Sequence, residues 1–357
     1  MIRNLNIKVY LNFDYIKADY LEFEKRFALT PFQSADWLEL WNDKVGLPLL
    51  KIMPQIVKIK VDEKIFMILP FGIRKKYGVK ILEWMGGINS DYLGPIFDKD
   101  LIKIKNINLL WSKILVELKK FDAINLEKQS IEVVNILKTI GLDYEFKEHE
   151  KSERAILPNS WDEYQKSLKK NLKSDTKRQK RRLNEIGDLK FYQPIDEKSK
   201  KEIIKEMIAQ KRIRYKLKKQ WDMFGIKEYR DFYMSLSCIK SSSFSVQCSS
   251  IKINNDSIAT HVGILNKDSF YYLMPSHLSN FHKYSPGRIL LFELIERAID
   301  RNVDFFDFTI GGEIYKKSFI NDEQLLFRSI KAFNIFGVYF SNIENLKSRL
   351  KSFLLND

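Results

Sequence analysis

Residues 244–274 read FSVQCSSIKINNDSIATHVGILNKDSFYYLM, and this stretch decides the fold of the second half of the chain. It contains three runs rich in β-branched and aromatic residues, at 244–253, 257–265 and 269–274. Asn-Asn-Asp and Asn-Lys-Asp separate these runs, and Asn and Asp tolerate the backbone conformations that tight hairpin turns need. The stretch therefore predicts three consecutive antiparallel strands.

On either side of this stretch the apolar spacing alternates between the helical and the strand period. The elements expected there are a strand over 189–195, helices over 197–215, 227–239 and 286–300, and strands over 303–309 and 324–334. From residue 189 onward, the predicted order is therefore β-α-α-β-β-β-α-β-turn-β.

The first half of the chain also alternates between strands and helices, which indicates an α/β (α+β) fold class. Ser34 is placed to cap a helix, with Trp37 one turn further on. The other expected elements are strands over 6–10, 56–61, 65–73, 79–84, 123–126 and 144–157 and helices over 108–121 and 131–139.

Pro158-Asn159-Ser160 interrupts the pattern and predicts a division into domains 1–158 and 159–357. A basic amphipathic helix over 161–186 leads into the second domain, and it carries nine lysines and arginines counted on the sequence. This helix forms either a wall of a groove for a phosphorylated ligand or a solvated face of a lysine-rich protein.

Composition favours a globular protein with an anionic partner. The formal net charge is +15, which suits a phosphate-bearing ligand, a nucleic acid or a membrane surface, or reflects a compositional bias of the source. No helix-turn-helix or zinc-finger signature accompanies the charge, so DNA is not an expected partner. The apolar run 65–73 is too short to span a bilayer, and no secretory signal is present, so we expect a cytoplasmic protein without an integral membrane segment.

Cysteine and histidine usage predicts neither a disulfide framework nor a metal site. The two cysteines do not form a C-x-x-C pair. The four histidines show no i, i+4 pairing with a carboxylate. These residues are Cys238, Cys248, His149, His261, His277 and His282.

Three motifs of the second half carry a family resemblance: ATHVG at 259–263, YSPGRILL at 284–291 and DFTIGGEIYK at 307–316. Together with FQSADW at 32–37 and SDYLGP at 90–95, they resemble the CelD/BcsL family of GNAT-like acyltransferases. The resemblance implies two tandem GNAT-like (acyl-CoA N-acyltransferase) domains with mixed central sheets flanked by helices. It also implies an enzyme of polysaccharide biosynthesis that moves an acyl group from acyl-CoA to an amine or hydroxyl of a sugar precursor.

Two alternatives stay open. The tandem domains more distantly resemble Fem-type peptidyltransferases, which take aminoacyl groups from tRNA, and the basic helix 161–186 suits a tRNA backbone. The expected partners are therefore a phosphorylated acyl donor and a sugar or envelope-precursor acceptor, with tRNA as the other donor. The second alternative is a non-catalytic GNAT-like scaffold, because the usual GNAT pyrophosphate pattern is not reproduced.

The resemblance implies that the donor lies between the third of the predicted strands and the helix over 286–300. Pro286 and Gly287 suit the start of that helix, whose free amides favour phosphate. The strand over 270–276 is expected to pair with the pantetheine arm of the donor. The residues assigned to donor binding are Met274, Lys283, Ser285, Gly287 and Arg288.

The same resemblance assigns candidate catalytic residues. His261 is the preferred general base, because imidazole titrates near neutral pH, although a core histidine is the alternative. Asp307 and Glu313 are further candidates for the base, or they cap the glycine turn. Tyr315 is the expected acid for the leaving thiolate, and Lys316 is expected to stabilise negative charge. We expect direct transfer without a covalent enzyme intermediate.

Overall fold

The computed structural model describes residues 4–27, 30–311 and 313–355, so Gly312 of the predicted glycine turn lies outside the described residues. The chain forms two compact units, residues 1–150 with 325–357 and residues 151–324. The sequence placed residues 325–357 in the second domain. They group with the first unit because strand β13 (Asp322–Ala332) pairs with β6 (Ala123–Gln129) of the first sheet.

The first unit is built on a mixed sheet whose strand order is β1-β2-β3-β4-β6-β13, with β5 paired to β3. Its strands through β4 are antiparallel, whereas β4 and β6 run parallel. The remaining strands are β1 (Leu5–Tyr10), β2 (Met53–Val61), β3 (Lys64–Lys76), β4 (Val79–Trp84) and β5 (Ile96–Phe97). The helices are α1 (Lys17–Phe27), α2 (Ala35–Trp41), α3 (Leu110–Glu117), α4 (Ile131–Thr139) and α10 (Ile335–Leu355).

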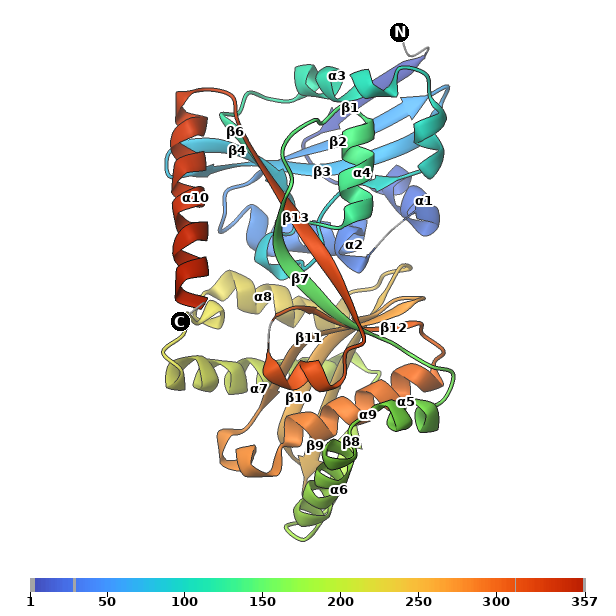
Figure 1. Ribbon diagram of the computed structural model, residues 1–357, viewed down its shortest axis with the longest axis vertical. Coiled ribbons are helices and arrows are strands. Elements are labelled where there is room, and N and C mark those ends of the chain that lie inside the picture. The colour runs from blue at the N-terminus through green and yellow to red at the C-terminus, as the bar shows by residue number, and fades with distance from the viewer. Residues whose placement is uncertain (1–3, 28–29, 312, 356–357) are drawn as a thin grey trace. The chain divides into compact units, whose positions relative to one another are not determined.

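Both faces of the first sheet are covered, as the alternation of buried residues requires. Ile81 and Ala123 pack against Phe340 of α10 on one face. Their neighbours Leu82 and Ile124 join the larger core with α3 and α4 on the other face (Figure 1). This arrangement places α10 over the parallel pair β4 and β6.

The second unit contains the three strands predicted from residues 244–274. Its strand order is β7-β12-β11-β10-β9-β8, in which β11 and β12 run parallel and the other neighbours antiparallel. The strands are β7 (Lys147–Ile156), whose last residues belong to this unit, β8 (Leu189–Tyr192), β9 (Ser245–Ile253), β10 (Asp256–Leu265), β11 (Ser269–His277) and β12 (Phe305–Ile310).

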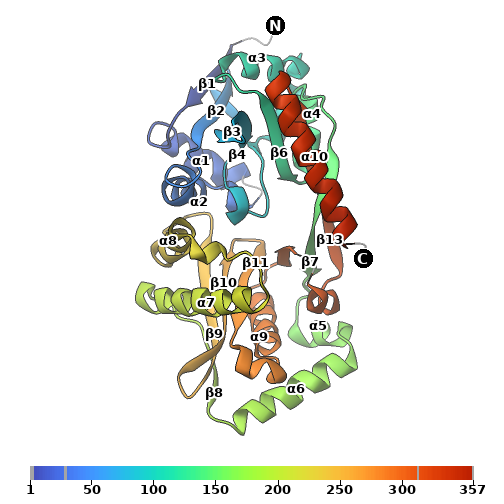
Figure 2. The same cartoon turned by 90° about the vertical axis from the view of Figure 1, so that its left-hand side faces the viewer.

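Helices pack on both faces of the second sheet. Helix α7 packs on β9, β10 and β11, and α9 packs on the same strands from the other side (Figure 2). Helix α8 accompanies α7, while α5 and α6 lie against α9. These helices are α5 (Trp161–Ser167), α6 (Lys170–Asn184), α7 (Glu197–Leu217), α8 (Lys227–Ser235) and α9 (Pro286–Asp300).

Local chemistry explains the predicted turns and caps. Asn254 and Asn255 both have positive φ, at 50° and 86°, which is the backbone that a two-residue hairpin turn requires. The Ser34 hydroxyl accepts a hydrogen bond from the backbone N–H of Trp37 over 3.3 Å, so the predicted N-cap is confirmed.

The predicted helix over 161–186 is wrong in one respect, because it is divided into α5 and α6. Leu168 takes an extended backbone with ψ of 144° and buries its side chain in the core of the second unit, which interrupts the helix. Helices α1 and α10 were not predicted from the sequence.

Candidate active site

The parallel strands β11 and β12 separate after a short shared segment. Their pairing joins residues 269–271 to residues 305–307, although β11 continues to His277. Over its remaining length β11 stays paired with β10, and His277 lies opposite Ala259. Residues 272–277 therefore present a backbone edge that β12 does not cover, and such an edge can pair with an extended ligand.

The segment after β12 brings Tyr315 to this edge. It forms the short 3-10 helix η9 (Ile314–Ser318). The phenol of Tyr315 lies close enough to the phenol of Tyr272 for each to influence the pKa of the other, and Tyr272 is the first residue of β11 beyond the pairing with β12. Desolvation, followed by the charge of Glu313, raises the pKa of Tyr315. The phenol therefore keeps its proton at neutral pH and can donate it.

Lys316 lies buried under the same segment, with an exposed fraction of 3%. Its ammonium donates to the carbonyl oxygen of Phe308 over 2.9 Å and pairs with the Glu313 carboxylate over 2.8 Å. Burial acts to raise the pKa of Glu313, but the Lys316 ammonium outweighs burial and the pKa is lowered. Glu313 is therefore ionised at neutral pH and is a weak base, and the bond from Lys316 to Phe308 fastens η9 to β12.

His261 lies in the aromatic core. Its ring stacks on Tyr272 and Phe270, with centroid distances of 4.6 Å and 5.6 Å. Burial, followed by the charge of Lys211, lowers the pKa of His261 to about 3. A group with this pKa takes up a proton poorly at neutral pH, and this argues against His261 as the general base.

The carboxylate of Asp307 is hydrogen bonded to the backbone of its own strand. Its carboxylate accepts hydrogen bonds from the backbone N–H of Thr309 over 2.7 Å and from the hydroxyl of Ser152 over 3.2 Å. Thr309 has a φ of +58°, and the register between β12 and β7 shifts between Asp307 and Ile310. The Asp307 carboxylate therefore stabilises the irregular backbone of β12 just before the glycine turn. This role resembles the alternative in which Asp307 caps that turn.

Only part of the first turn of α9 is available to bind a phosphate group. Ser285 is the N-cap, with a φ of 51°, and its carbonyl oxygen accepts from the backbone N–H of Arg288 over 3.0 Å. The guanidinium of Arg288 is paired with Asp175 of α6. Among the described residues, no backbone acceptor is found for the N–H of Gly287. The backbone N–H of Gly287 is therefore available to a ligand, whereas the guanidinium of Arg288 is already paired with Asp175.

The two other predicted donor-binding residues, Met274 and Lys283, precede this turn in the chain. Met274 is part of the uncovered edge of β11 and pairs with Val262 of β10 on its other side. The ammonium of Lys283 lies over the ring of Tyr284, 5.1 Å from its centroid. Both residues belong to the same end of the second sheet as Gly287.

Two cations of α7 and the lysine at its C-cap were not predicted as site residues from the sequence. Lys211, Arg214 and Lys218 recur at helical spacing, and electrostatic interactions couple them to His277 at the end of β11. The sequence contains a pattern that points to these cations, because they continue the helical spacing of the buried residues Ile203 and Met207.

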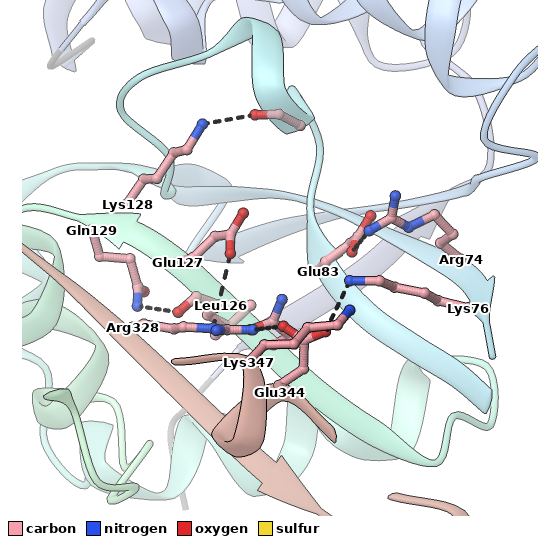
Figure 3. A network of polar contacts seen from close by, with 12 residues as sticks. Arg74, Lys76, Glu83, Leu126, Glu127, Lys128, Gln129, Arg328, Glu344 and Lys347 are labelled. Carbon is pink, nitrogen blue, oxygen red and sulfur yellow. Dashed lines mark hydrogen bonds and ion pairs between the residues drawn. The ribbon is translucent and has the colours of Figure 1, made fainter. Parts of the chain in front are cut away.

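The first unit also contains a pair of parallel strands, β4 and β6, but hydrogen bonds bridge the two strands beyond their pairing. Strands β4 and β6 pair over residues 81–83 and 123–125. Beyond this segment, the ammonium of Lys128 donates to the carbonyl oxygens of Gly87 and Ser90 over 3.1 Å and 2.6 Å (Figure 3). The loop after β4 is therefore fastened to the end of β6.

A charged network adjoins this closure. Glu344 of α10 accepts from Arg328 over 2.7 Å and from Lys76 over 3.1 Å, while Arg74 pairs with Glu83 over 2.9 Å (Figure 3). Burial acts to raise the pKa of Glu344, but Arg328 and Lys76 outweigh it and lower the pKa to about 2. In the first unit, side chains of the chain itself therefore bridge the place where β4 and β6 separate. In the second unit, the edge of β11 stays uncovered by β12.

A groove of about 430 Å³ lies between α5, α6 and α9, so the basic segment does form a wall of a groove. Trp161 and Phe292 contribute aromatic surface, and Lys173 and Lys177 contribute positive charge. Glu293 lies in the same groove and pairs with Lys180 over 2.7 Å. The groove is therefore of mixed charge.

Two further searches cover the described part of the chain. Within it, no group of three or more His, Cys, Asp or Glu side chains is arranged to hold a metal ion. None of its helices has the length and apolar character needed to cross a bilayer.

Comparisons with known proteins agree with the geometry of the second unit. Residues 170–317 match the family model of the acetyltransferase (GNAT) domain. The structure of FemX is similar with a TM-score of 0.59 and 11% identity, over 88% of this chain and 96% of that one. A conserved protein of unknown function from Bacteroides thetaiotaomicron gives a TM-score of 0.56 and 11% identity, over 91% and 99% of the two chains.

A third similar structure is the C-terminal domain of a protein from Agrobacterium fabrum named as a lysylphosphatidylglycerol synthetase. Its TM-score is 0.55 with 8% identity, over 92% of this chain and 96% of that one. At such identities the likeness is one of fold. A search of curated proteins gave no significant match.

The match of residues 170–317 to the GNAT domain, together with the fold, supports one class of protein: the enzyme is an acyltransferase. The non-catalytic scaffold is thereby set aside. The CelD/BcsL assignment stays a prediction from the sequence motifs.

Proposed function

We propose that this acyltransferase moves an acyl group directly from acyl-CoA to an amine or hydroxyl of a sugar or polysaccharide precursor. The observation that carries the proposal is the separation of β11 from β12, with Tyr315 beside the uncovered edge. The extended arm of a thioester donor pairs with residues 272–277 as an added strand would. This pairing brings the thioester carbonyl next to the phenol of Tyr315.

The reaction follows from these positions. The acceptor nitrogen or oxygen attacks the thioester carbon, and the oxyanion that forms accepts a hydrogen bond from a backbone N–H of the β11 edge. The carbon–sulfur bond then breaks, and the thiolate takes the proton of Tyr315. The acceptor gives up its own proton to water, and water reprotonates Tyr315. Holding both reactants at one edge supplies a large part of the acceleration.

An aminoacyl group carried by tRNA is the second candidate for the donor. One observation favours it: Arg288, expected to hold the phosphates of coenzyme A, is paired with Asp175. The Fem-type resemblance and the lysines of α6 supply a rationale for a nucleic acid in that position. In this reading the leaving group is the ribose hydroxyl of the tRNA, and Tyr315 protonates it.

Calorimetry with the full chain distinguishes the two donors. Acetyl-CoA, longer acyl-CoAs and charged tRNA at low salt are titrated separately into folded protein. Saturable binding of an acyl-CoA supports the first proposal, and binding of charged tRNA alone supports the second. Binding of neither class of donor contradicts both.

A further inference from the structure

One side of helix α10 is fixed on the first unit. Phe340 is buried against β4 and β6 (Figure 2). Gly337 permits this close packing, because a Cβ there would lie 2.1 Å from the carbonyl oxygen of Asp122. One turn after Phe340, the carboxylate of Glu344 pairs with two cations of the sheet. The position of the helix on its own unit is therefore set by packing and by charge.

Another side of α10 carries an apolar stripe that its own unit does not bury. Four of its five side chains are more than half exposed, and the central isoleucine is partly exposed. Spacings of three and four residues alternate along the stripe, which gives the seven-residue repeat at which one helix packs along another. The apolar stripe consists of Phe336, Tyr339, Ile343, Leu346 and Leu350.

The exposed apolar surface of α10 is large for a single chain. Ile335 and Val338 flank the apolar stripe and are also exposed. At about 200 Å² for a large side chain, these two residues and the four exposed residues of the stripe present roughly 700 Å². The largest apolar patch on a typical monomer covers about 300–600 Å². Two such faces together give about 1,400 Å², which lies within the range of about 1,200–2,000 Å² that a stable interface buries.

The charge of this face indicates a second copy of the chain as the partner. With a formal net charge of +15, two copies repel one another where their charged surfaces meet. Between residues 335 and 346 the only charged residue is Glu344, which is paired on the buried side of the helix. Depletion of charge and enrichment in aromatic residues are typical of an interface core. A helix that binds a membrane surface instead carries lysine and arginine beside its apolar face, and residues 335–346 contain neither.

We propose that two copies of this chain form a dimer in which the apolar stripes of their α10 helices pack against each other. A twofold dimer uses the same patch on both copies, so the stripe needs only to be complementary to itself. Its seven-residue repeat provides that complementarity, because side chains at this spacing interdigitate with those of an identical helix. The interface belongs to the first unit and is separate from the acyl transfer assigned to the second unit.

Sedimentation velocity of the full chain over a range of concentrations tests the proposal. The unmodified protein is expected to sediment as a dimer and to dissociate on dilution. Tyr339→Glu and Leu346→Glu each place a charge in the apolar stripe, and we expect each to weaken the Kd of the dimer by about tenfold or more. Val116→Glu is the matched control, because Val116 is an exposed apolar residue of α3 outside the stripe. We expect this control to dimerise with the affinity of the unmodified protein.

Disulfide capture provides a second measurement that does not depend on a weakened variant. Ile343→Cys lies at the centre of the stripe, and the exposed thiol of the natural chain is removed by Cys238→Ser. Mild oxidation is expected to link two copies through residue 343, because the two stripes meet there. Val116→Cys in the same background is the control and should remain unlinked.

Three results would overturn the inference. The first is a monomer at every concentration without disulfide capture at residue 343. The second is a dimer of Leu346→Glu as stable as that of Val116→Glu. The third is a monomer that floats with vesicles of phosphatidylcholine and phosphatidylglycerol and loses this binding in Leu346→Glu, since the stripe would then contact a membrane.

Discussion

The phenols of Tyr272 and Tyr315 lie within reach of each other's charge at the point where β11 leaves β12. Tyr272 is fixed in the core by its stacking on His261, whereas Tyr315 lies on η9 and is 40% exposed. One phenol is thus rigid and the other is accessible to a substrate. The neighbouring phenol of Tyr272 therefore forms part of the surroundings of Tyr315 at the uncovered edge.

Replacing Tyr315 by Phe is expected to lower kcat by about 10²-fold or more, because the leaving group then loses its proton donor. Tyr272→Phe removes only the phenol that neighbours Tyr315, and we expect a loss of roughly tenfold or less. Steady-state kinetics with the donor identified by calorimetry checks both values. Tyr15→Phe, at an exposed residue of the first unit, is the control. Full activity of Tyr315→Phe would remove the phenol from the mechanism.

His261→Phe is expected to reduce the acid sensitivity of the second unit. In the unfolded chain the imidazole has a pKa near 6.5, and in the folded chain about 3. Between these values the unfolded state binds a proton that the folded state does not, so stability falls as pH decreases, by at most about 1.4 kcal/mol per pH unit. Urea unfolding at pH 7, 6 and 5 should therefore give a shallower dependence for the variant. The same slope in both proteins would show that His261 does not cause it.

Glu344→Gln is expected to destabilise the first unit by about 2 kcal/mol at neutral pH, because Arg328 and Lys76 lose their carboxylate. The folded pKa of about 2 lies below the ordinary value of 4.5, so this stabilisation is present above pH 4.5 and is lost as pH falls towards 2. Hydrogen exchange of α10 peptides at pH 7 measures the effect. Asp100→Asn, which removes an exposed ion pair with Lys103, should change exchange little.

Gly311→Ala is expected to weaken the placement of η9. Gly311 has a φ of 147°, and a Cβ there would lie 2.7 Å from a carboxylate oxygen of Glu313. The substitution therefore strains the backbone and displaces the Glu313–Lys316 pair, so kcat should fall with the fold retained. Circular dichroism and kinetics test this expectation together. Gly78→Ala, where a Cβ meets no atom within 4 Å, is the control for positive φ alone.

Much of the fold could be predicted from the sequence because it depends on local patterns. The hairpin at Asn254 and Asn255, the Ser34 cap and the start of α9 after Ser285 all follow from short-range chemistry. The return of β13 to the first sheet could not be predicted, because its pairing partner β6 lies about 200 residues earlier in the chain.

Less of the candidate site could be predicted from the sequence, because the site also depends on contacts between residues far apart in the chain. Arg288 is 113 residues from Asp175, and no local pattern reveals that they pair. The burial of His261 depends on rings contributed by another strand. Lys211, Arg214 and Lys218 show helical periodicity in the sequence, but which side of α7 faces the sheet cannot be read from that periodicity.

Hydrogen exchange of residues 272–277 tests the central claim most directly. Backbone amides of this segment that β12 leaves uncovered should become protected when the donor binds, because the donor pairs with that edge. The loop 84–93 of the first unit, already fastened by Lys128, should be unchanged. Unchanged exchange over residues 272–277 with a saturating donor, or protection confined to the first unit, would contradict acyl transfer at β11.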